Sequence, residues 1–227
     1  FGFAMHKHKF PGIQMVARTH GCDLYDEREL YGKQFFQPQM DMRLDRLIFA
    51  AQFAKDYYLD KYHKQKTNKY SLHCLGVSKK GVAYEQRKER HREGATFLLV
   101  SCSHVLPIKR VCLIADGLST IENENVKWVH IGGGEEWETL QKEVQQKLGD
   151  KKNIQYQFTG TLTNDKVLHF YRENYVSCFI TTTQTEGGSP VSVQEALSFG
   201  VPVIATSVGE LPRMINGNGI LLSENPD

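Results

Sequence analysis

Long apolar runs and paired cysteines are absent from this sequence. No stretch approaches the roughly 18 consecutive apolar residues that a membrane-spanning helix needs. The five cysteines are scattered, odd in number and without a Cys-x-x-Cys pair, which argues against a disulfide framework and against a zinc site. No secretory signal segment is visible either. We therefore expect reduced thiols and a cytoplasmic location.

Motifs of several enzyme classes are missing as well. The absence of Gly-x-Ser-x-Gly, of a Walker lysine motif and of Gly-x-Gly-x-x-Gly argues against serine hydrolases, P-loop nucleotidases and Rossmann dehydrogenases. No Asp-x-Asp pair follows a predicted strand, so a metal ion that bridges two carboxylates and a diphosphate is not predicted. An excess of one charge is also lacking. The net charge is only +2, and nucleic acid is not an expected partner.

The sequence does contain a repeated alternation of strands and helices. Its 227 residues, 40% of them hydrophobic, suit one or two globular domains. Short apolar runs at 70–75, 126–131 and 154–158 predict strands, and an aromatic-rich helix is expected at 52–63. Another predicted helix carries the apolar stripe of Val111, Ile114, Ala115 and Leu118, and Asn164 is a residue that favours a helix start. This order predicts an α/β fold in which helices cover both faces of parallel sheets. Such sheets bind ligands at the carboxyl ends of their strands.

A charged segment divides the chain. Residues 78–94, SKKGVAYEQRKERHREG, are poor in aliphatic side chains, and their interleaved glutamates favour an exposed linker over a basic binding surface. We therefore predict a first domain at 1–77, a linker at 78–94 and a second domain at 95–227. The chain begins at Phe1 and ends at Asp227, directly after the strand-like Gly219–Leu222. We expect it to be a piece of a longer protein, with both domains cut.

The stretch from 176 to 206 carries the clearest chemistry. Apolar Val176–Ile180 predicts a strand, a glycine turn follows, and Pro190 opens a helix that Gly200 ends. A helix that starts behind such a turn presents free N–H groups and the positive end of its dipole, which together suit phosphate. Glu186 and Glu195 flank this position. Carboxylates beside a phosphate are better suited to hydroxyl groups, as on a sugar or a ribose.

The segment EGGSPVSVQEALSFGVPVIATSVGE resembles the donor-site signature of retaining family 4 glycosyltransferases of the GT-B fold. Those enzymes carry two glutamates, then a helix of small residues and a Gly-x-Pro-Val-Ile-Ala segment. Here Glu186 and Glu195 are separated by one residue more than the glutamates of the family, so Gly187 stands in the first-glutamate position. The resemblance implies two Rossmann-like domains with doubly wound parallel sheets, the first of them incomplete here.

The resemblance also implies roles for individual residues. Glu195 would accept hydrogen bonds from the ribose hydroxyls. Glu186, or the turn around Gly187, would accept those of the transferred sugar. The backbone of the turn and of the helix start would hold the departing diphosphate. The residues concerned are Gly187, Gly188, Ser189, Pro190 and Val191.

A second part of the resemblance lies in SHVLPIKR, residues 103–110. In the family, an arginine and a lysine spaced as His104 and Lys109 are here bind the donor pyrophosphate. Lys109, which we expect at the start of the next helix, is a compact charge suited to that ligand. Histidine lacks the permanent charge and the fork of donors that arginine has, and Arg110 is the candidate to compensate for the replacement.

Two glycine turns follow other strands of the second domain. Gly160 and Thr161 match the family's loop that contacts the nucleotide base through backbone groups. Gly132–Gly134 could cradle phosphate, but helix starts also need glycine for close packing, and the structural interpretation is favoured.

In the first domain His20 is the main candidate, because it follows a predicted strand, 13–19, and precedes Gly21. Family members place a histidine at this strand end beside the transferred sugar. Arg18 and Asp23 are candidates for acceptor contacts. The sequence His6–Lys9 could suggest a metal site, but a solvated turn before Pro11 is favoured.

These observations predict a metal-independent retaining glycosyltransferase that uses a nucleotide-diphosphate sugar and no cofactor. His20, Lys109 and Glu186 would carry the catalytic roles. The segments at 101–110 and 186–200 resemble those of bacterial family members that build surface polysaccharides. A carbohydrate or lipid-linked acceptor is therefore expected. Peripheral contact with the inner face of the membrane stays open. Two alternatives also stay open. One is a GT-B nucleotide-sugar epimerase, and the other is a non-catalytic partner subunit, suggested by the replaced arginine and the displaced glutamate.

Binding of a nucleoside diphosphate should not require a divalent ion. The helix start and Lys109 supply positive potential where paired aspartates are absent. We expect the same Kd in excess EDTA and in magnesium, measured by calorimetric titration. A loss of affinity of tenfold or more in EDTA, about 1.4 kcal/mol, would show that a metal ion meets the charge.

Overall fold

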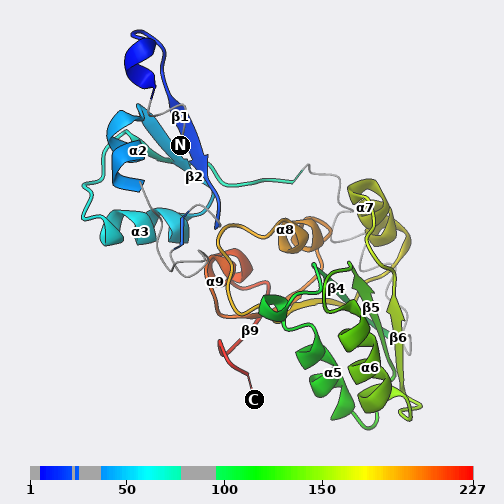
Figure 1. The fold of residues 1–227 in the computed structure, drawn as a ribbon. Helices are drawn as coiled ribbons and strands as arrows, with labels where there is room; N and C mark the ends of the chain where they lie inside the picture. The colour runs from blue at the N-terminus through cyan, green and yellow to red at the C-terminus, as the bar shows by residue number, and fades with distance from the viewer. Residues whose placement is uncertain (1–5, 22–23, 26–36, 78–95, 227) are drawn as a thin grey trace. The chain divides into compact units, whose positions relative to one another are not determined.

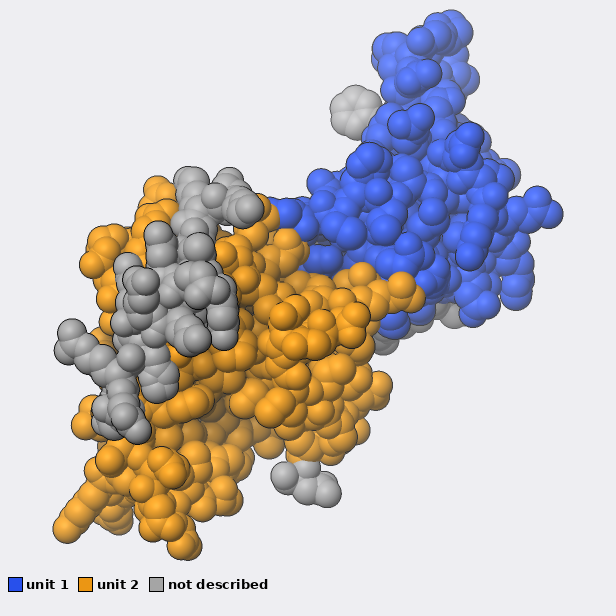
Figure 2. Space-filling view, turned by 180° about the vertical axis from the view of Figure 1, so that it is seen from behind, with its two compact units in different colours: residues 1–76, 186–189 blue, residues 77–185, 190–227 orange. Residues whose placement is uncertain are grey.

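The computed structural model describes residues 6–21, 24–25, 37–77 and 96–226. The chain divides into two compact units (Figure 2). Unit 1 comprises residues 1–76 and 186–189, and unit 2 comprises residues 77–185 and 190–227. The predicted linker at 78–94 lies outside the described residues.

Unit 1 is a small parallel sheet with helical crossovers (Figure 1). In chain order its elements are η1 (Lys7–Lys9), β1 (Val16–Thr19), α2 (Gln37–Arg43), β2 (Arg46–Phe49), α3 (Gln52–Lys61) and β3 (Tyr70–Leu72). The strand order is β1-β2-β3, and both neighbouring pairs are parallel. Parallel neighbours cannot be joined by a tight hairpin, so α2 and α3 serve as the crossovers. The predicted strands at 13–19 and 70–75 are present but shorter than expected.

Aromatic rings fill the core of unit 1. Phe49 and Tyr58 are fully buried, and their ring centroids lie 5.3 Å apart. The ring of Tyr70 lies 6.0 Å from that of Tyr58. Burial raises the pKa of both tyrosines well above the ordinary value, so both hydroxyls remain neutral. The aromatic helix predicted at 52–63 therefore supplies core side chains.

A buried carboxylate ties α2 to this core. Asp41 is 2% exposed, accepts a hydrogen bond from the Tyr70 hydroxyl at 2.8 Å, and pairs with Lys64 at 3.0 Å and Lys69 at 3.2 Å. Burial raises the pKa of Asp41, but the hydrogen bonds from Lys64, Tyr70 and Lys69 outweigh it and hold the pKa below its ordinary value. The folded unit therefore favours the ionised carboxylate.

Unit 2 is a doubly wound parallel sheet. Its order is β6-β5-β4-β7-β8-β9, with every neighbouring pair parallel. In chain order its elements are β4 (Phe97–Cys102), η4 (Pro107–Lys109), α5 (Cys112–Ser119), β5 (Val126–Ile131), α6 (Trp137–Leu148), β6 (Ile154–Phe158), α7 (Asn164–Glu173), β7 (Cys178–Thr181), α8 (Val191–Ser198), β8 (Val203–Thr206), α9 (Leu211–Ile215) and β9 (Gly219–Leu222). No described helix is long and apolar enough to cross a bilayer.

Two cores lie on opposite faces of this sheet. Successive strand residues point to opposite faces, so Leu99 and Trp128 join the core beneath α5 and α6, whereas Val100 and Val129 join the other. That second core lies beneath α7, α8 and α9 (Figure 1). The predicted α/β architecture, with helices on both faces, is confirmed.

One predicted boundary is wrong in a way that affects the site. We expected Lys109 at the start of a helix. Lys109 instead ends the 3-10 turn η4, which Pro107 opens, and α5 begins at Cys112. Arg110 lies between them with a left-handed φ of 46°. This conformation interrupts the helical path and separates the lysine from the dipole of α5.

Replacing Asp41 should loosen unit 1. Asp41→Asn keeps the shape of the side chain but leaves Lys64 and Lys69 without their charge partner. The cost should be about 2–3 kcal/mol, below that of a fully buried pair, because both lysines retain contact with water. Hydrogen–deuterium exchange of β2 and β3 should accelerate roughly thirty- to hundredfold. Since the pKa of Asp41 is lowered, this difference should be present at neutral pH and vanish as the pH falls through that pKa.

Asp45→Asn is the matched control, because Asp45 is an exposed partner of Lys7. Its exchange rates should equal those of the wild type. Equal rates in the two variants would show that the Asp41 network does not stabilise the unit.

Candidate functional site

The predicted donor-site segments of unit 2 leave the sheet where its strand order reverses. From β4 the chain moves outward through β5 and β6, and β7 then returns to the other side of β4, followed by β8 and β9. Loops that leave β4 and β7 at their carboxyl ends diverge from each other, and ligands of open α/β sheets bind there. Residues 103–110 and 182–190 belong to these two loops.

Hydrogen bonds join the two loops. The Gln184 N–H donates to the Ile108 carbonyl at 2.8 Å, and the buried Thr182 hydroxyl donates to the Arg110 carbonyl at 2.8 Å. The Thr183 hydroxyl donates to the Thr185 carbonyl at 2.9 Å. The threonines that precede the glycine turn thus fix its first half against the β4 loop.

Three predicted phosphate ligands lie on the β4 loop in different environments. His104 is exposed, and Lys109 is half-buried at the end of η4. The Arg110 guanidinium donates to the carbonyls of Thr182 at 2.8 Å and Glu224 at 2.6 Å. It thereby joins the β7 loop to the segment after β9. This set of partners favours a structural role for Arg110 and does not support its use as a substitute for the missing arginine.

The start of α8 offers free backbone donors. Pro190 precedes the helix as its N-cap residue, one position earlier than predicted, with φ −62° and ψ 121°. Among the residues that the structure describes, no side chain caps the first turn, which begins at the exposed Val191. Those N–H groups lack intrahelical partners by geometry, and an anion would satisfy them.

The glycine turn itself is grouped with unit 1. Glu186, Gly187, Gly188 and Ser189 belong to that unit, whereas Glu195 belongs to unit 2. Within unit 1 the Tyr25 hydroxyl donates to the Gly187 carbonyl at 3.2 Å, and the Ser189 hydroxyl to the Ala50 carbonyl at 3.4 Å. A side chain at Gly188 would meet no described atom within 4 Å, so a ligand could approach its backbone closely.

Glu195 is held by a residue that the sequence did not single out as a site residue. Its side chain lies on α8 at 6% exposure, and the side-chain amide of Asn164, the first residue of α7, donates to its Oε1. Burial raises the pKa of Glu195 although the Asn164 hydrogen bond opposes the shift. Burial and the nearby Glu195 together raise the pKa of Cys102 to about 11. We had interpreted Asn164 only as a residue that favours a helix start.

Glycines interlock the loops after β4, β5 and β6. The Gly132 N–H donates to the Gly160 carbonyl at 3.0 Å, and the Val105 N–H donates to the Gly133 carbonyl at 3.1 Å. A Cβ atom at Gly132 would lie 1.9 Å from the Ser103 carbonyl oxygen, and φ at Gly132 is 141°. Only glycine permits this approach. The contacts support the structural interpretation of the Gly132–Gly134 turn.

The base loop that we predicted at Gly160 and Thr161 is accessible. Gly160 has a φ of 68° with open space around it, and Thr161 is exposed. The loop leaves β6 at its carboxyl end, as the prediction requires.

In unit 1, His20 directly follows β1 and is exposed, so it lies at the carboxyl end of that sheet. The guanidinium of Arg18 donates to the His73 carbonyl at 2.7 Å, which gives it a structural partner. Asp23 lies outside the described residues. Across the described ranges, no three His, Cys, Asp or Glu side chains converge as metal ligands.

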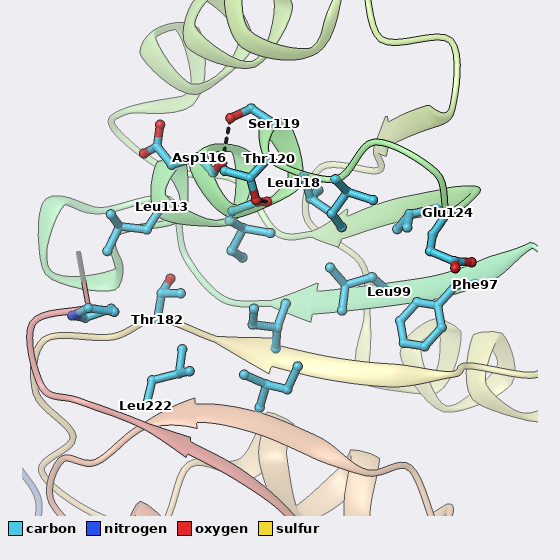
Figure 3. Close-up of a pocket in the computed structure, with 17 residues that line it drawn as sticks. Phe97, Leu99, Leu113, Asp116, Leu118, Ser119, Thr120, Glu124, Thr182 and Leu222 are labelled. Carbon is cyan, nitrogen blue, oxygen red and sulfur yellow. Dashed lines mark hydrogen bonds between the residues drawn. The ribbon is translucent and has the colours of Figure 1, made fainter.

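A large apolar cavity of about 860 Å³ lies elsewhere in unit 2. Figure 3 shows Leu99, Leu113 and Leu118 around it, between α5 and the sheet. None of the predicted site residues lines this cavity. Its walls offer few partners for phosphates or hydroxyls, so it does not suit the ligand that the sequence predicts for the β4 and β7 loops.

Solved structures share this fold. A lipopolysaccharide outer core galactosyltransferase, WaaB, is 19% identical, with a TM-score of 0.65 over 89% of this chain and 54% of its own. The Anabaena protein HepE in complex with UDP is 14% identical, with a TM-score of 0.72 over 99% of this chain and 62% of its own. A sucrose-phosphate synthase from Thermosynechococcus elongatus is 15% identical, with a TM-score of 0.69 over 97% of this chain and 57% of its own. This chain therefore spans little more than half of their length. The predicted GT-B fold is confirmed.

A sequence family agrees with the fold. No curated protein matches the chain. The family model described as group 1 glycosyl transferases matches residues 94–227, which is more than half of the sequence and includes the β4 loop, the β7 loop and α8. The chain therefore belongs to the group 1 glycosyl transferases.

Proposed function

We propose that the chain is part of a retaining glycosyltransferase that takes a sugar from a nucleotide-diphosphate donor bound by unit 2. The observation that carries this proposal is the orientation of Glu195. Its carboxylate is buried on α8 and accepts a hydrogen bond from the side-chain amide of Asn164 on α7, and no described side chain caps the first turn of α8. The carboxylate proposed to bind the ribose and the first-turn amides proposed to bind the diphosphate thus lie on one helix, in the order that the donor requires.

The proposed chemistry places charge where fixed donors can meet it. As the bond between the sugar carbon and the phosphate oxygen breaks, negative charge grows on the leaving diphosphate. First-turn amides of α8 and the Lys109 ammonium would stabilise that charge without reorganising. The acceptor oxygen forms the new bond to the same face of the sugar carbon, and its proton passes to the departing phosphate. His20 and Glu186 would orient the sugar and the acceptor.

Donor and acceptor classes follow from the similar proteins and from the resemblance. HepE structures contain UDP, and one contains UDP and glucose. A uridine-diphosphate sugar is therefore the first donor to test. We further propose metal-independent transfer to a carbohydrate or lipid-linked acceptor in polysaccharide synthesis, in the cytoplasm or at the inner face of the membrane.

One observation favours a second candidate, a non-catalytic partner subunit. With Arg110 engaged by carbonyls, His104 and Lys109 are left as the cationic candidates on the β4 loop. Release of UDP from UDP-glucose and from other UDP-sugars by the full-length protein, with and without acceptor sugars, separates the two. Turnover supports the transferase, whereas UDP binding without any turnover supports the partner subunit.

Removing the Glu195 carboxylate should weaken UDP binding and leave the fold intact. Glu195→Ala deletes the acceptor of the ribose hydroxyls, and a hydrogen bond to a charged group contributes about 1.5–3 kcal/mol. The Kd for UDP should rise roughly ten- to hundredfold in calorimetric titration. Alanine is favourable within a helix, so far-UV circular dichroism should not change.

Glu138→Ala, an exposed change on α6, is the matched control and should bind UDP as the wild type does. A folded Glu195→Ala variant with wild-type affinity would show that Glu195 does not hold the ribose.

A further inference from the structure

Three buried polar side chains on β4 and β5 are linked by hydrogen bonds near the β4 loop. The Trp128 indole N–H donates to the Ser101 hydroxyl oxygen at 2.9 Å, and that hydroxyl lies 2.8 Å from Nδ1 of His130. Trp128 and His130 are fully buried, and Ser101 is 3% exposed. All three lie on β4 and β5, close to the carboxyl ends of these strands.

The hydrogen bonds among Trp128, Ser101 and His130 favour one tautomer of the His130 ring. An indole N–H can only donate, so the Ser101 oxygen accepts from Trp128. The Ser101 proton then needs an acceptor, and Nδ1 of His130 is the neighbouring one. With Nδ1 as that acceptor, the proton of the neutral ring lies on Nε2, and this is the tautomer that the inference uses. Burial lowers the pKa of His130 to about 4, so the ring stays neutral near pH 7.

The Nε2–H group lies beneath the backbone of Ser103. Nε2 has no hydrogen-bond partner of standard geometry among the described residues, and the Ser103 backbone partly opposes the lowering of the pKa of the ring. The space next to Gly132 brings the two groups together. A Cβ atom placed there would lie 1.9 Å from the Ser103 oxygen and 3.4 Å from Nε2. A buried N–H group without a partner is costly, so an acceptor is favoured on this side of the ring, where the Ser103 carbonyl lies.

The direction of this carbonyl sets the direction of the next amide. In a trans peptide the C=O and N–H groups point in opposite directions, and no described peptide bond is cis. When the Ser103 carbonyl faces His130, the His104 N–H faces away from the core. The flanking amides are used, since Ser103 donates to Ile131 and Val105 donates to Gly133. No described group accepts a hydrogen bond from the His104 N–H.

We propose that His130 is a positioning residue that aims the backbone N–H of His104 at the diphosphate of the donor. The inference rests on the proposed function, because it assigns a ligand to an amide of the proposed phosphate loop. It also gives position 104 a hydrogen-bond donor to phosphate that does not depend on the side chain. A backbone N–H is retained when histidine stands where an arginine would be.

The nucleotide test compares UDP with uridine on the full chain. His130→Phe keeps a planar ring against Trp128 and Phe158, at 6.3 and 6.4 Å between centroids, but removes the donor. Its affinity for UDP should fall roughly tenfold or more, whereas its affinity for uridine should not change. His130→Gln places a side-chain amide near the Nε2 position and should recover part of the loss. A purely structural defect would weaken both ligands alike or leave UDP unaffected, and either result would overturn the proposal.

The tautomer test needs no variant. In the wild-type chain with 15N-labelled histidine, the imidazole of His130 should show a protonated Nε2 and an unprotonated Nδ1. The opposite tautomer would overturn the inference even if His130→Phe failed to fold. A wild type that binds none of UDP, ADP, GDP and CDP would instead contradict the proposed function, and the inference would fall with it.

Discussion

The site depends on one constraint, the close approach of three loops at the carboxyl end of the unit 2 sheet. Gly132 lets the Ser103 carbonyl pass where any side chain would collide, and the amides of Gly132 and Val105 close hydrogen bonds to the neighbouring loops. A loop held by its own backbone bonds loses little further freedom when a ligand binds. The cost of ordering the proposed phosphate loop is therefore met by folding rather than by binding.

Neighbouring side chains of the proposed site differ in their partners and therefore in their roles. Arg110 and Lys109 are adjacent in sequence, yet the guanidinium binds protein carbonyls while the lysine remains in the proposed phosphate role. Five fixed N–H donors suit arginine to joining several carbonyls at once, and a single mobile ammonium suits an anion that arrives and leaves. Glu195 and Asn164 follow the same logic, because a neutral amide orients the carboxylate without neutralising it.

Much of the architecture could be predicted from sequence because strands and helices follow from apolar runs and from the spacing of apolar residues. The strands at 126–131 and 154–158 have the predicted bounds, and the stripe from Val111 to Leu118 is buried as expected. The prediction that a helix starts at Lys109 was wrong. Apolar spacing reports which face is buried, but not the left-handed turn at Arg110 that delays α5 to Cys112.

The sequence by itself determined the order of strands and helices, the two segments that leave the sheet at its point of reversal, and the family resemblance of the helix that follows the glycine turn. Tertiary structure alone decided the partners of the charged and polar groups. Asn164 meets Glu195, Arg110 meets Thr182 and Glu224, and His130 lies beneath Ser103. These partners are far apart along the chain. Periodicity encodes burial over a few turns, whereas such pairings exist only after parallel strands bring their carboxyl ends to one edge.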